Sequence, residues 1–483
     1  MSKPVYLALV FGLLLIHLGM AACVPPAADE LYYWCWAKEP QWSYYDHPPL
    51  TAYLIGASTS VFGDNLFAIR LPACLCMFTT LLLLSRLVRP LWPLTMLLAT
   101  PLCFFGGILI TPDAPLMCIW TAYLVWLVHL HTRLSDANDG PTWRTWAAGG
   151  VLLGLGIMSK YTMGLAGATV ALSLFTIRPW NKWFAGLLLH GAVAFVVSLP
   201  ILLYNIQRDF EPLLFQWQHT METEVTTIRY LPDYIGGQIL FLGWLPFALT
   251  PWLIYRWRSL HADPRLRACL WLFLAPFLFF LYKATRDRVE LNWPVACYIA
   301  FFPLAAYWFD EMRDRTVLRW FGASAFLIPI FATCALTWHL ISPLDVIPPA
   351  ADRVHLHASW CSLSRDVGSA VHRLDPEAPV FTLVYQDASY LRFHHVRAEQ
   401  LAGADRPSHF TQRPVLPEQQ TRFFLLAKRA PSFTGFAPPT VVGEFPLSTR
   451  GQVICKYLLV RYEKTGSQPA GTDPLLARSS ASP

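Results

Sequence analysis

The sequence is poor in charged residues. Of its 483 residues 14% are Asp, Glu, Lys or Arg, whereas 55% are hydrophobic. A soluble domain has roughly 25% charged residues, so a deficit over the whole chain indicates a protein that lies in a lipid bilayer. The net charge is only +6, and no run of basic residues is typical of a nucleic-acid surface. We therefore expect membrane lipids, and no nucleic acid, as partners.

Other common functional patterns are also missing. The sequence has no CxxC or Cys/His metal-binding spacing, no Gly-rich phosphate loop, no nucleotide-sugar motif and no internal repeat. Most of the 11 cysteines lie in apolar runs and are predicted to pack in the core. Cys23 and Cys35 flank the acidic pair Asp29-Glu30, and Cys361 and Cys455 lie in the more polar C-terminal third. An oxidising compartment would allow disulfides among these four. The sequence leaves their pairing open.

Long apolar runs fill the first two thirds of the chain. About eleven of them approach the length of a membrane-spanning helix. They are roughly 5–23, 66–86, 91–109, 114–131, 146–160, 163–177, 183–203, 236–255, 268–282, 292–309 and 320–342. With the N-terminus in the cytoplasm, the basic residues of the short loops fall on the cytoplasmic side and the longer acidic loops lie outside, as the positive-inside rule requires.

The two ends of the chain differ from the middle. The first run, which ends near Cys23, is interpreted as an uncleaved helix, and a cleaved secretory or lipoprotein signal is the alternative. After residue 342 the apolar runs PVFTLVY, RFFLLAK and ICKYLLVRY have strand length. We therefore predict a transmembrane domain over 1–342, an α/β domain outside the membrane over 343–463 and a disordered tail over 464–483.

The outward loops concentrate acidic and aromatic residues. Asp29 and Glu30 follow the first run, where a solvated helix end is the alternative to a functional site. Tryptophans and tyrosines come next and suit the membrane interface. The motif YYDHPPL then places Asp46 and His47 before two prolines, which stop a helix and stiffen the chain.

Two further outward positions join these acids. Asp113, in TPDAPL, stands at the outer end of the fourth run, either as a helix cap or as a functional group. Lys160, in GIMSKYTMGL, ends an apolar run on the same side, where its ammonium needs water or a partner. Carboxylates from separate loops on one membrane face predict a site.

Positive charge also occurs on the outer side. Lys283, Arg286 and Arg288 lie in LYKATRDRVELNWP, against the positive-inside trend, and either bind an anion such as phosphate or pair with nearby acids. His219 lies in the loop 204–235, which mixes amides, acids and aromatic residues suited to a sugar. His219 is either a surface histidine or, with Asp46, a ligand of a divalent cation.

Together these motifs resemble the integral-membrane glycosyltransferases of the GT-C superfamily, in the bacterial branch related to the dolichyl-phosphate-mannose protein mannosyltransferases. That branch includes the aminoarabinose and galacturonic-acid transferases that modify lipid A. The resemblance rests on Asp29-Glu30, YYDHPPL, TPDAPL, LGLGIMSKYTMGL and RVELNWP, and covers roughly residues 5–310. It implies a mainly α fold, a polytopic GT-C helical bundle of about eleven transmembrane helices with a small C-terminal α/β domain outside the membrane.

The resemblance also implies an activity. A sugar would pass from a polyprenyl phosphate to an acceptor hydroxyl at the periplasmic face of the bacterial inner membrane, in one displacement that inverts the anomeric carbon. Carried over by position, Asp29 is the catalytic residue and general base, Glu30 stands beside it, and Asp113 is the second important acid. No nucleotide is needed.

The remaining residues are carried over as donor-phosphate or metal ligands. Lys160 matches the lysine that meets the lipid phosphate, and Arg286 and Arg288 would stabilise the leaving phosphate. His47 stands where the lipid A enzymes usually have lysine, after Asp46 in place of their glutamate. Because histidine, unlike lysine, is not always charged, this departure leaves open whether a fixed positive charge stands at this position. The identity of the sugar and of the acceptor is left open for the same reason.

Several alternatives remain at this point. The acceptor is expected to be lipid A or another envelope glycan, with protein hydroxyls as the second choice. A lipid or sugar flippase would share the many helices and intramembrane charges, although repeats and broken helices near the midplane would be expected of it. A membrane scaffold explains the acidic loops less well. The donor sugar, metal dependence and oligomeric state are open.

Overall fold

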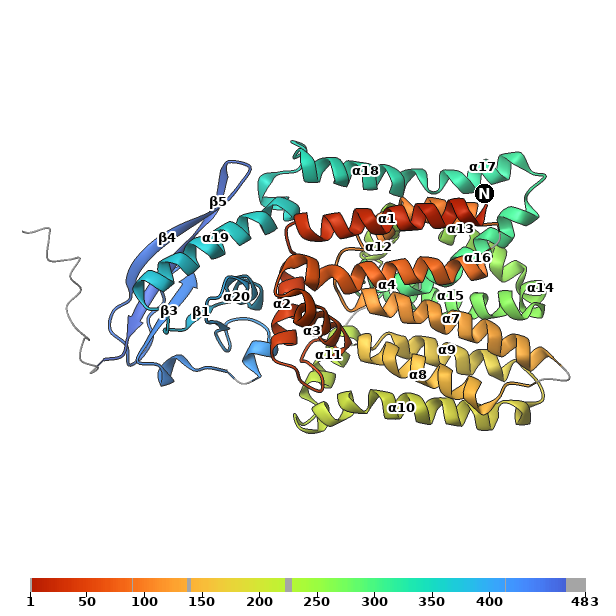
Figure 1. Ribbon diagram of the computed structural model, residues 1–483, viewed down its shortest axis with the longest axis horizontal. Coiled ribbons are helices and arrows are strands. Elements are labelled where there is room, and N and C mark those ends of the chain that lie inside the picture. Colours follow the sequence, from red (N-terminus) through yellow and green to blue (C-terminus); the bar gives the residue numbers. More distant parts are fainter. Residues whose placement is uncertain (1, 89, 137–139, 222–227, 413, 466–483) are drawn as a thin grey trace, which may run out of the picture. The chain divides into compact units, whose positions relative to one another are not determined.

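The computed structural model describes residues 2–88, 90–136, 140–221, 228–412 and 414–465 (Figure 1). It divides into two compact units, Met1–Leu344 and Asp345–Pro483. The first unit is helical, and the second contains a five-stranded sheet. The predicted fold class, a helical membrane bundle followed by a small α/β domain, is confirmed.

Six helical stretches in the described part of the chain are long and apolar enough to cross a bilayer. They are α1 (Lys3–Cys23), α4 (Leu66–Leu87), α7 (Asp113–Ser135), α10 (Phe184–Ile206), α15 (Pro264–Lys283) and the stretch Thr316–Ile341, which holds α17 (Thr316–Ser324) and α18 (Leu327–Ile341). A bent helix pair brings the number to seven. The expected count of about eleven spans is not confirmed, because other apolar helices, such as α9 (Met163–Phe175), are shorter.

One expected span, 91–109, is not a continuous helix. It breaks into α5 (Trp92–Leu98) and α6 (Pro101–Phe104). Pro101 has no N–H to continue the first helix, and a residue before proline is pushed to an extended conformation. Thr100 accordingly has φ −83° and ψ 155°.

Another expected span, 236–255, is sharply bent. It consists of α12 (Leu231–Leu242) and α13 (Leu245–Tyr255), whose axes differ by 101°. Gly243 lies at the bend with φ +99°, a conformation that glycine adopts without steric cost. A Cβ atom there would lie 2.3 Å from the carbonyl oxygen of Ala325.

The region around Asp29-Glu30 and YYDHPPL is largely helical rather than an open loop. It forms α2 (Ala28–Lys38) and α3 (Leu50–Phe62), and part of the later outward loop forms α11 (Glu211–Met221). Asn65 caps α4, since its side chain accepts a hydrogen bond of 2.9 Å from the backbone N–H of Ala68. These short helices place polar residues at the ends of the long ones.

Helix α7 lies at the centre of the bundle. It packs against α4, α15, α8 (Trp143–Ser159) and α16 (Val295–Glu311), and α1 packs on α4 (Figure 1). The shared core is rich in leucine, phenylalanine and tryptophan, as expected of helices buried among other helices. The remaining elements of this unit are η1 (Trp180–Lys182) and α14 (Trp257–Ala262).

The second unit is built on a mixed sheet with the strand order β2-β1-β3-β5-β4. The strands are β1 (Val380–Thr382), β2 (Ala398–Gln400), β3 (Arg422–Ala427), β4 (Thr440–Thr449) and β5 (Gln452–Glu463). Strand β1 is parallel to β2 and β3, whereas β5 is antiparallel to β3 and β4. The first two runs predicted as strands contain β1 and β3, and the third lies within β5, so this prediction is confirmed.

Two helices accompany the sheet. Helix α19 (Arg353–Leu374) packs against β4 and against α20 (Tyr385–Phe393). The short elements are η2 (Pro349–Ala351), η3 (His409–Thr411) and η4 (Pro417–Gln419). Phe423 and Tyr462 stack in the core with ring centroids 4.8 Å apart. From residue 466 on, the tail that was expected to be disordered lies outside the described residues.

Candidate active site

Glu30 and Arg70 form a buried ion pair at the start of α2. The Nε and Nη2 atoms of Arg70 donate hydrogen bonds of 2.9 and 2.6 Å to the two carboxylate oxygens of Glu30. Their side chains are 1% and 0% exposed. Glu30 also accepts from the backbone N–H groups of Ala27, at 2.9 Å, and Ile110, at 3.2 Å. The carboxylate is thus saturated, as a buried charge requires.

Arg70 binds three chain segments together. Besides Glu30, its guanidinium donates to the carbonyl oxygens of Ala21 (3.4 Å), Val24 (2.6 Å) and Pro25 (3.0 Å). The end of α1, the start of α2 and the body of α4 therefore meet at one side chain. Asp29, next to Glu30 in the first turn of α2, is exposed. The two neighbouring acids thus differ: Glu30 is buried and bound to Arg70, whereas the side chain of Asp29 is exposed.

Asp113 is the centre of a second polar network. Lys160 Nζ lies 2.7 Å from its Oδ1 atom, and Asn292 Nδ2 donates a hydrogen bond of 2.6 Å to its Oδ2 atom. The Ser159 hydroxyl donates to the carbonyl oxygen of Pro112 at 2.7 Å, which ties the end of α8 to the start of α7. Asp113 and Lys160 are 5% and 6% exposed. The sequence indicated that the Lys160 ammonium needs water or a partner. In the structure its partner is the carboxylate of Asp113.

The two networks lie at the same end of the bundle. Ile110, whose N–H reaches Glu30, stands three residues before Asp113. The segment between α6 and α7 thus connects the start of α2 with the start of α7. Four helices contribute to this region: α2 with Asp29, α4 with Arg70, α7 with Asp113 and α8 with Lys160 at its C-cap.

The YYDHPPL motif is packed against aromatic residues of α2. Tyr32 donates a hydrogen bond of 2.6 Å from its hydroxyl to Oδ2 of the buried Asp46. The ring of His47 lies 6.2 and 6.5 Å from the rings of Tyr33 and Trp36. Pro49 is the N-cap of α3, so the two prolines end the segment where a new helix begins.

The basic segment after α15 divides into paired and unpaired residues. Lys283 pairs with Asp287 at 3.1 Å, and Arg288 pairs with Glu290 at 3.1 Å while its side chain is 74% exposed. Arg286 lies over the ring of Tyr282, 5.3 Å from its centroid, and makes no ion pair with any described residue. Internal pairing, the alternative to an anion site, therefore holds for Lys283 and Arg288.

The predicted metal pair is described only in part. The His219 side chain lies outside the described residues, although its backbone belongs to α11. Two other contacts tie the same region to the segment between α2 and α3. Arg208 donates a 3.1 Å hydrogen bond to Gln41 and lies over Tyr204, and the Tyr45 hydroxyl donates to Glu211 at 3.2 Å.

Sequence reasoning did not identify Arg70, Asn292 and Arg208. Arg70 had a usable signal, because it is an ionisable residue inside an otherwise apolar run, and such residues are usually paired and functional. Asn292 had none, since an amide next to a Trp-Pro pair is common in turns. Its contact with Asp113 joins positions 179 residues apart.

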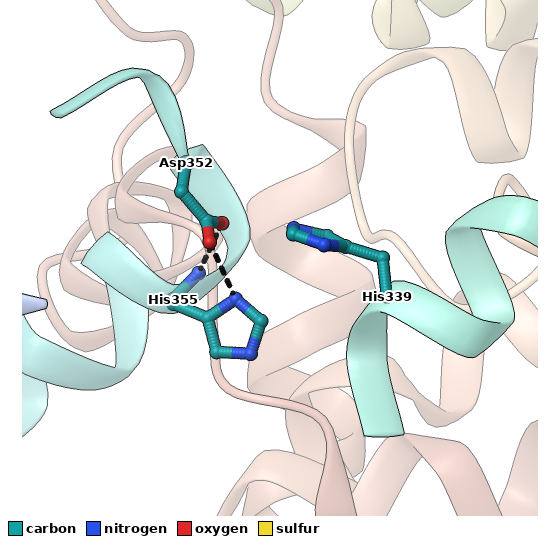
Figure 2. A group of neighbouring side chains, drawn as sticks. All are labelled: His339, Asp352 and His355. Atoms are coloured by element: carbon teal, nitrogen blue, oxygen red, sulfur yellow. Dashed lines mark hydrogen bonds and ion pairs between the residues drawn. The ribbon is translucent and has the colours of Figure 1, made fainter. Parts of the chain in front are cut away.

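The chain between the two units has its own capping contacts, and the side chains are drawn in Figure 2. Asp352 is the N-cap of α19 and accepts a hydrogen bond of 3.1 Å from the backbone N–H of His355. Its other oxygen lies 2.9 Å from Nδ1 of the same histidine. His339, on α18, accepts a hydrogen bond of 3.0 Å from the backbone N–H of Leu344. Cys23, Cys74, Cys76, Cys103, Cys118, Cys269, Cys297, Cys334 and Cys455 are free thiols.

Comparison with known proteins connects this geometry to a family. Residues 46–204 match the model of a family described as dolichyl-phosphate-mannose-protein mannosyltransferase. The lipid A galacturonosyltransferase RgtD of Rhizobium johnstonii is 25% identical over 422 residues, which cover 81% of this chain and 84% of that protein. An undecaprenyl phosphate-alpha-4-amino-4-deoxy-L-arabinose arabinosyl transferase of Pseudomonas fluorescens is 26% identical, and the match covers 49% of this chain but only 45% of that relative.

Solved structures show the same fold. ArnT from Cupriavidus metallidurans in the apo state superposes with a TM-score of 0.61 at 16% identity, covering 94% of this chain and 97% of ArnT. The structure of that protein bound to undecaprenyl phosphate gives a TM-score of 0.60 at 15% identity. The chain therefore shares the fold of ArnT and has the apolar helices of a multi-pass membrane protein, and its sequence and structural similarities together support a GT-C glycosyltransferase.

Proposed function

We propose that this protein transfers a sugar from a polyprenyl-phosphate donor to lipid A or another envelope glycan at the periplasmic face of the bacterial inner membrane. The observation that carries this proposal is the convergence of an exposed Asp29 with two buried ion networks at one end of the bundle. Such an arrangement supplies an accessible proton acceptor next to fixed positive charge. The lipid A and undecaprenyl-phosphate relatives support the substrate classes.

In the proposed reaction the acceptor hydroxyl attacks the anomeric carbon of the donor sugar. Asp29 takes the hydroxyl proton, and the bond from the anomeric carbon to the phosphate oxygen breaks with inversion. Glu30 and Arg70 act as positioning residues, because they fix the turn of α2 that presents Asp29. A carboxylate held on a rigid helix keeps the distance to the hydroxyl that proton transfer needs.

The leaving polyprenyl phosphate gains negative charge as the bond breaks. The Lys160 ammonium uses one N–H for Asp113 and has two more to offer. Arg286 adds a guanidinium without a described carboxylate partner. We assign the phosphate to Lys160, Arg286 and His47, and not to Arg288, which Glu290 already offsets. Preorganised positive charge favours the transition state more than the ground state.

A divalent cation is a further element of the proposal. Of its two expected ligands, Asp46 is buried and binds the Tyr32 hydroxyl through Oδ2, and a carboxylate is an ordinary ligand of a divalent cation. His219 would complete the pair. No step of the displacement above requires the cation.

Protein hydroxyls are the second candidate acceptor. The matched family model is that of protein mannosyltransferases, but it covers only residues 46–204. The match to the lipid A galacturonosyltransferase covers 81% of the chain, and for this reason we place lipid A or another glycan first.

The test is sugar transfer by the purified full-length protein in lipid nanodiscs. Wild-type protein with labelled polyprenyl-phosphate sugar and lipid A should give labelled lipid A, and Asp29→Asn should reduce the rate by at least 100-fold. The matched control is Asp233→Asn, an exposed acid in the first turn of α12, which should transfer at the wild-type rate. Equal rates for the Asp29 variant and the wild type would contradict the assignment of the base.

A further inference from the structure

The second unit contains an open cleft between α19 and β4. Its volume is ≈ 320 Å³, and its lining residues belong to these two elements. Strand β4 stands at one end of the strand order and pairs with β5, so the cleft lies at an edge of the sheet. Clefts that bind small molecules begin at about 300 Å³. The cleft therefore has room for one small ligand.

Helix α19 supplies one wall of the cleft. Ser362 and Asp366 are four residues apart, so they lie on the same face of the helix, and both are exposed. Neither side chain makes a hydrogen bond or an ion pair with another described residue. Leu363 also lines the cleft and is 4% exposed. This wall thus combines a hydroxyl and a carboxylate with apolar surface.

Strand β4 supplies the other wall. The ring of Phe445 lies over Gly443, because a Cβ atom on that glycine would be 2.8 Å from Phe445 Cε2. A glycine within a strand often marks a place where another group approaches the backbone closely, and here that group is the ring. Phe445, Pro446 and Ser448 line the cleft, and Phe445 is partly exposed. This wall is therefore mainly apolar, with one further hydroxyl.

A contact between the two walls holds the cleft in shape. The Ser359 hydroxyl donates a hydrogen bond of 2.6 Å to the carbonyl oxygen of Ser448 and lies 3.0 Å from Oγ1 of the buried Thr449. Ser359 and Ser448 both line the cleft, so α19 is tied to β4 within the lining itself. The cleft is therefore formed before a ligand binds.

The lining selects an uncharged ligand with several hydroxyl groups. None of the lining residues in the described part of the chain is Lys, Arg or His, so a phosphate would find no cation there and Asp366 would repel it. The carboxylate of Asp366 accepts hydrogen bonds through both oxygens, and serine hydroxyls donate and accept them. Neighbouring hydroxyls of a sugar ring supply both kinds of partner, and its apolar C–H face suits the ring of Phe445.

We propose that the cleft between α19 and β4 binds one uncharged sugar unit. The cleft is formed within the second unit, whereas every residue proposed for sugar transfer belongs to the first. This inference therefore goes beyond the proposed function and stands or falls without it. The sugar is either a free saccharide or the head group of a membrane glycolipid, since both present the same hydroxyls.

The experiment measures the binding of the methyl glycosides of glucose, galactose and mannose to the full-length protein in nanodiscs, by saturation-transfer difference NMR. Ser362→Trp fills the cleft from an exposed helix position and should abolish the binding seen with wild-type protein. The matched control is Ser432→Trp, which changes an exposed serine of the same unit outside the cleft and should bind like the wild type. Melting temperatures near that of the wild type show that both variants fold.

A second variant tests the carboxylate. Asp366→Ala removes an exposed side chain and should raise Kd for the methyl glycoside that binds best by about 10-fold or more, as expected for hydrogen bonds to a charged group. Glucose 6-phosphate should bind wild-type protein about 5-fold more weakly than methyl glucoside, because the Asp366 carboxylate repels the phosphate.

The two sources of the sugar are separated by competition. Glucosylceramide is added to the nanodiscs, and displacement of the bound methyl glycoside shows that a glycolipid head group reaches the cleft. Unchanged binding assigns the site to free saccharides. The proposal is wrong if no methyl glycoside binds the wild-type protein, if the two tryptophan variants bind equally well, or if glucose 6-phosphate binds more tightly than methyl glucoside.

Discussion

Arg70 and Glu30 meet through two hydrogen bonds of 2.9 and 2.6 Å inside the bundle, with both side chains withdrawn from solvent. A buried pair of this kind adds little net stability compared with apolar residues, but loss of one partner leaves an unpaired buried charge. The pair therefore acts mainly by fixing the turn of α2 that holds Asp29. The effect of the pair on the stability of the protein and its effect on the position of Asp29 can be measured separately.

Removing only one partner should destabilise the protein strongly. Arg70→Met leaves Glu30 buried without its cation, and the expected cost is about 3–5 kcal/mol, seen as a lower melting temperature in nanodiscs. The double variant Arg70→Met with Glu30→Leu removes both charges and should recover most of that loss. Its sugar transfer should nevertheless stay at least 10-fold below wild type, because Asp29 is no longer held. Full activity in the double variant would contradict the positioning role.

Asn292 should control the state of Asp113. Its amide donates to Oδ2 of Asp113 at 2.6 Å, so Asn292→Asp would place two carboxylates side by side. Like charges this close cannot both ionise easily, and we expect transfer at pH 7.5 to fall by about 10- to 100-fold. Asn292→Ala is the control, because it removes the hydrogen bond without adding charge, and it should cost about 3- to 10-fold. If Asn292 serves only as a turn residue, Asn292→Ala should instead reduce transfer more than Asn292→Asp does.

The two arginines after α15 should differ in their effect on the donor. Arg286 has no described carboxylate partner, whereas Arg288 is paired with Glu290 and mostly exposed. Arg286→Ala should therefore raise KM for the polyprenyl-phosphate donor about 10-fold or more, as expected for a charged hydrogen bond. Arg288→Ala should change it less than about twofold. Steady-state kinetics with increasing donor concentration measures both.

The second unit should lose stability as the pH rises. Burial raises the pKa of Asp387, on α20, from 3.8 to about 7, although Lys428 opposes the shift. The folded state then binds a proton that the unfolded state has released, so stability falls between about pH 4 and pH 7 and stays low above that range. The expected loss in the free energy of unfolding is on the order of 2–4 kcal/mol.

Asp387→Asn tests this pH dependence. The variant should be more stable than the wild type at pH 8 and should match it at pH 5, with amide hydrogen exchange of β3 and β5 in the full chain as the readout. Asp366→Asn, an exposed acid on α19, is the control and should follow the wild type at both pH values. An Asp387 variant that is less stable at pH 8 would show that the carboxylate is needed ionised.

Much of the architecture could be predicted from residue patterns. The apolar runs located α1, α4, α7, α10 and α15, because a bilayer forces long apolar helices to form with their own hydrogen bonds. The strand-like runs after residue 342 were also correct. The breaks were not predicted: Thr100-Pro101 and Gly243 interrupt runs that hydropathy alone joins, since average hydrophobicity does not register a missing N–H or a positive φ.

The site could be predicted only as a set of candidates. Asp29, Glu30, Asp113 and Lys160 were recognised as outward polar residues, but their pairings were not. Whether an acid is free for chemistry or bound to a cation depends on contacts between distant helices, such as the 40 residues between Glu30 and Arg70. The sequence therefore placed Glu30 beside Asp29 without showing that Arg70 occupies both of its oxygens.

The 101° bend between α12 and α13 constrains how the protein enters the membrane. Helices of 12 and 11 residues rise only about 18 and 16 Å, well short of the ~30 Å hydrocarbon layer. The backbone groups freed at Gly243 cannot face lipid, so they need shelter from neighbouring helices. Those neighbours include α6, made earlier in translation, and α18, made later. The pair can therefore settle at its final depth only after α18 has emerged from the ribosome, so its placement waits for a helix synthesised more than 70 residues later.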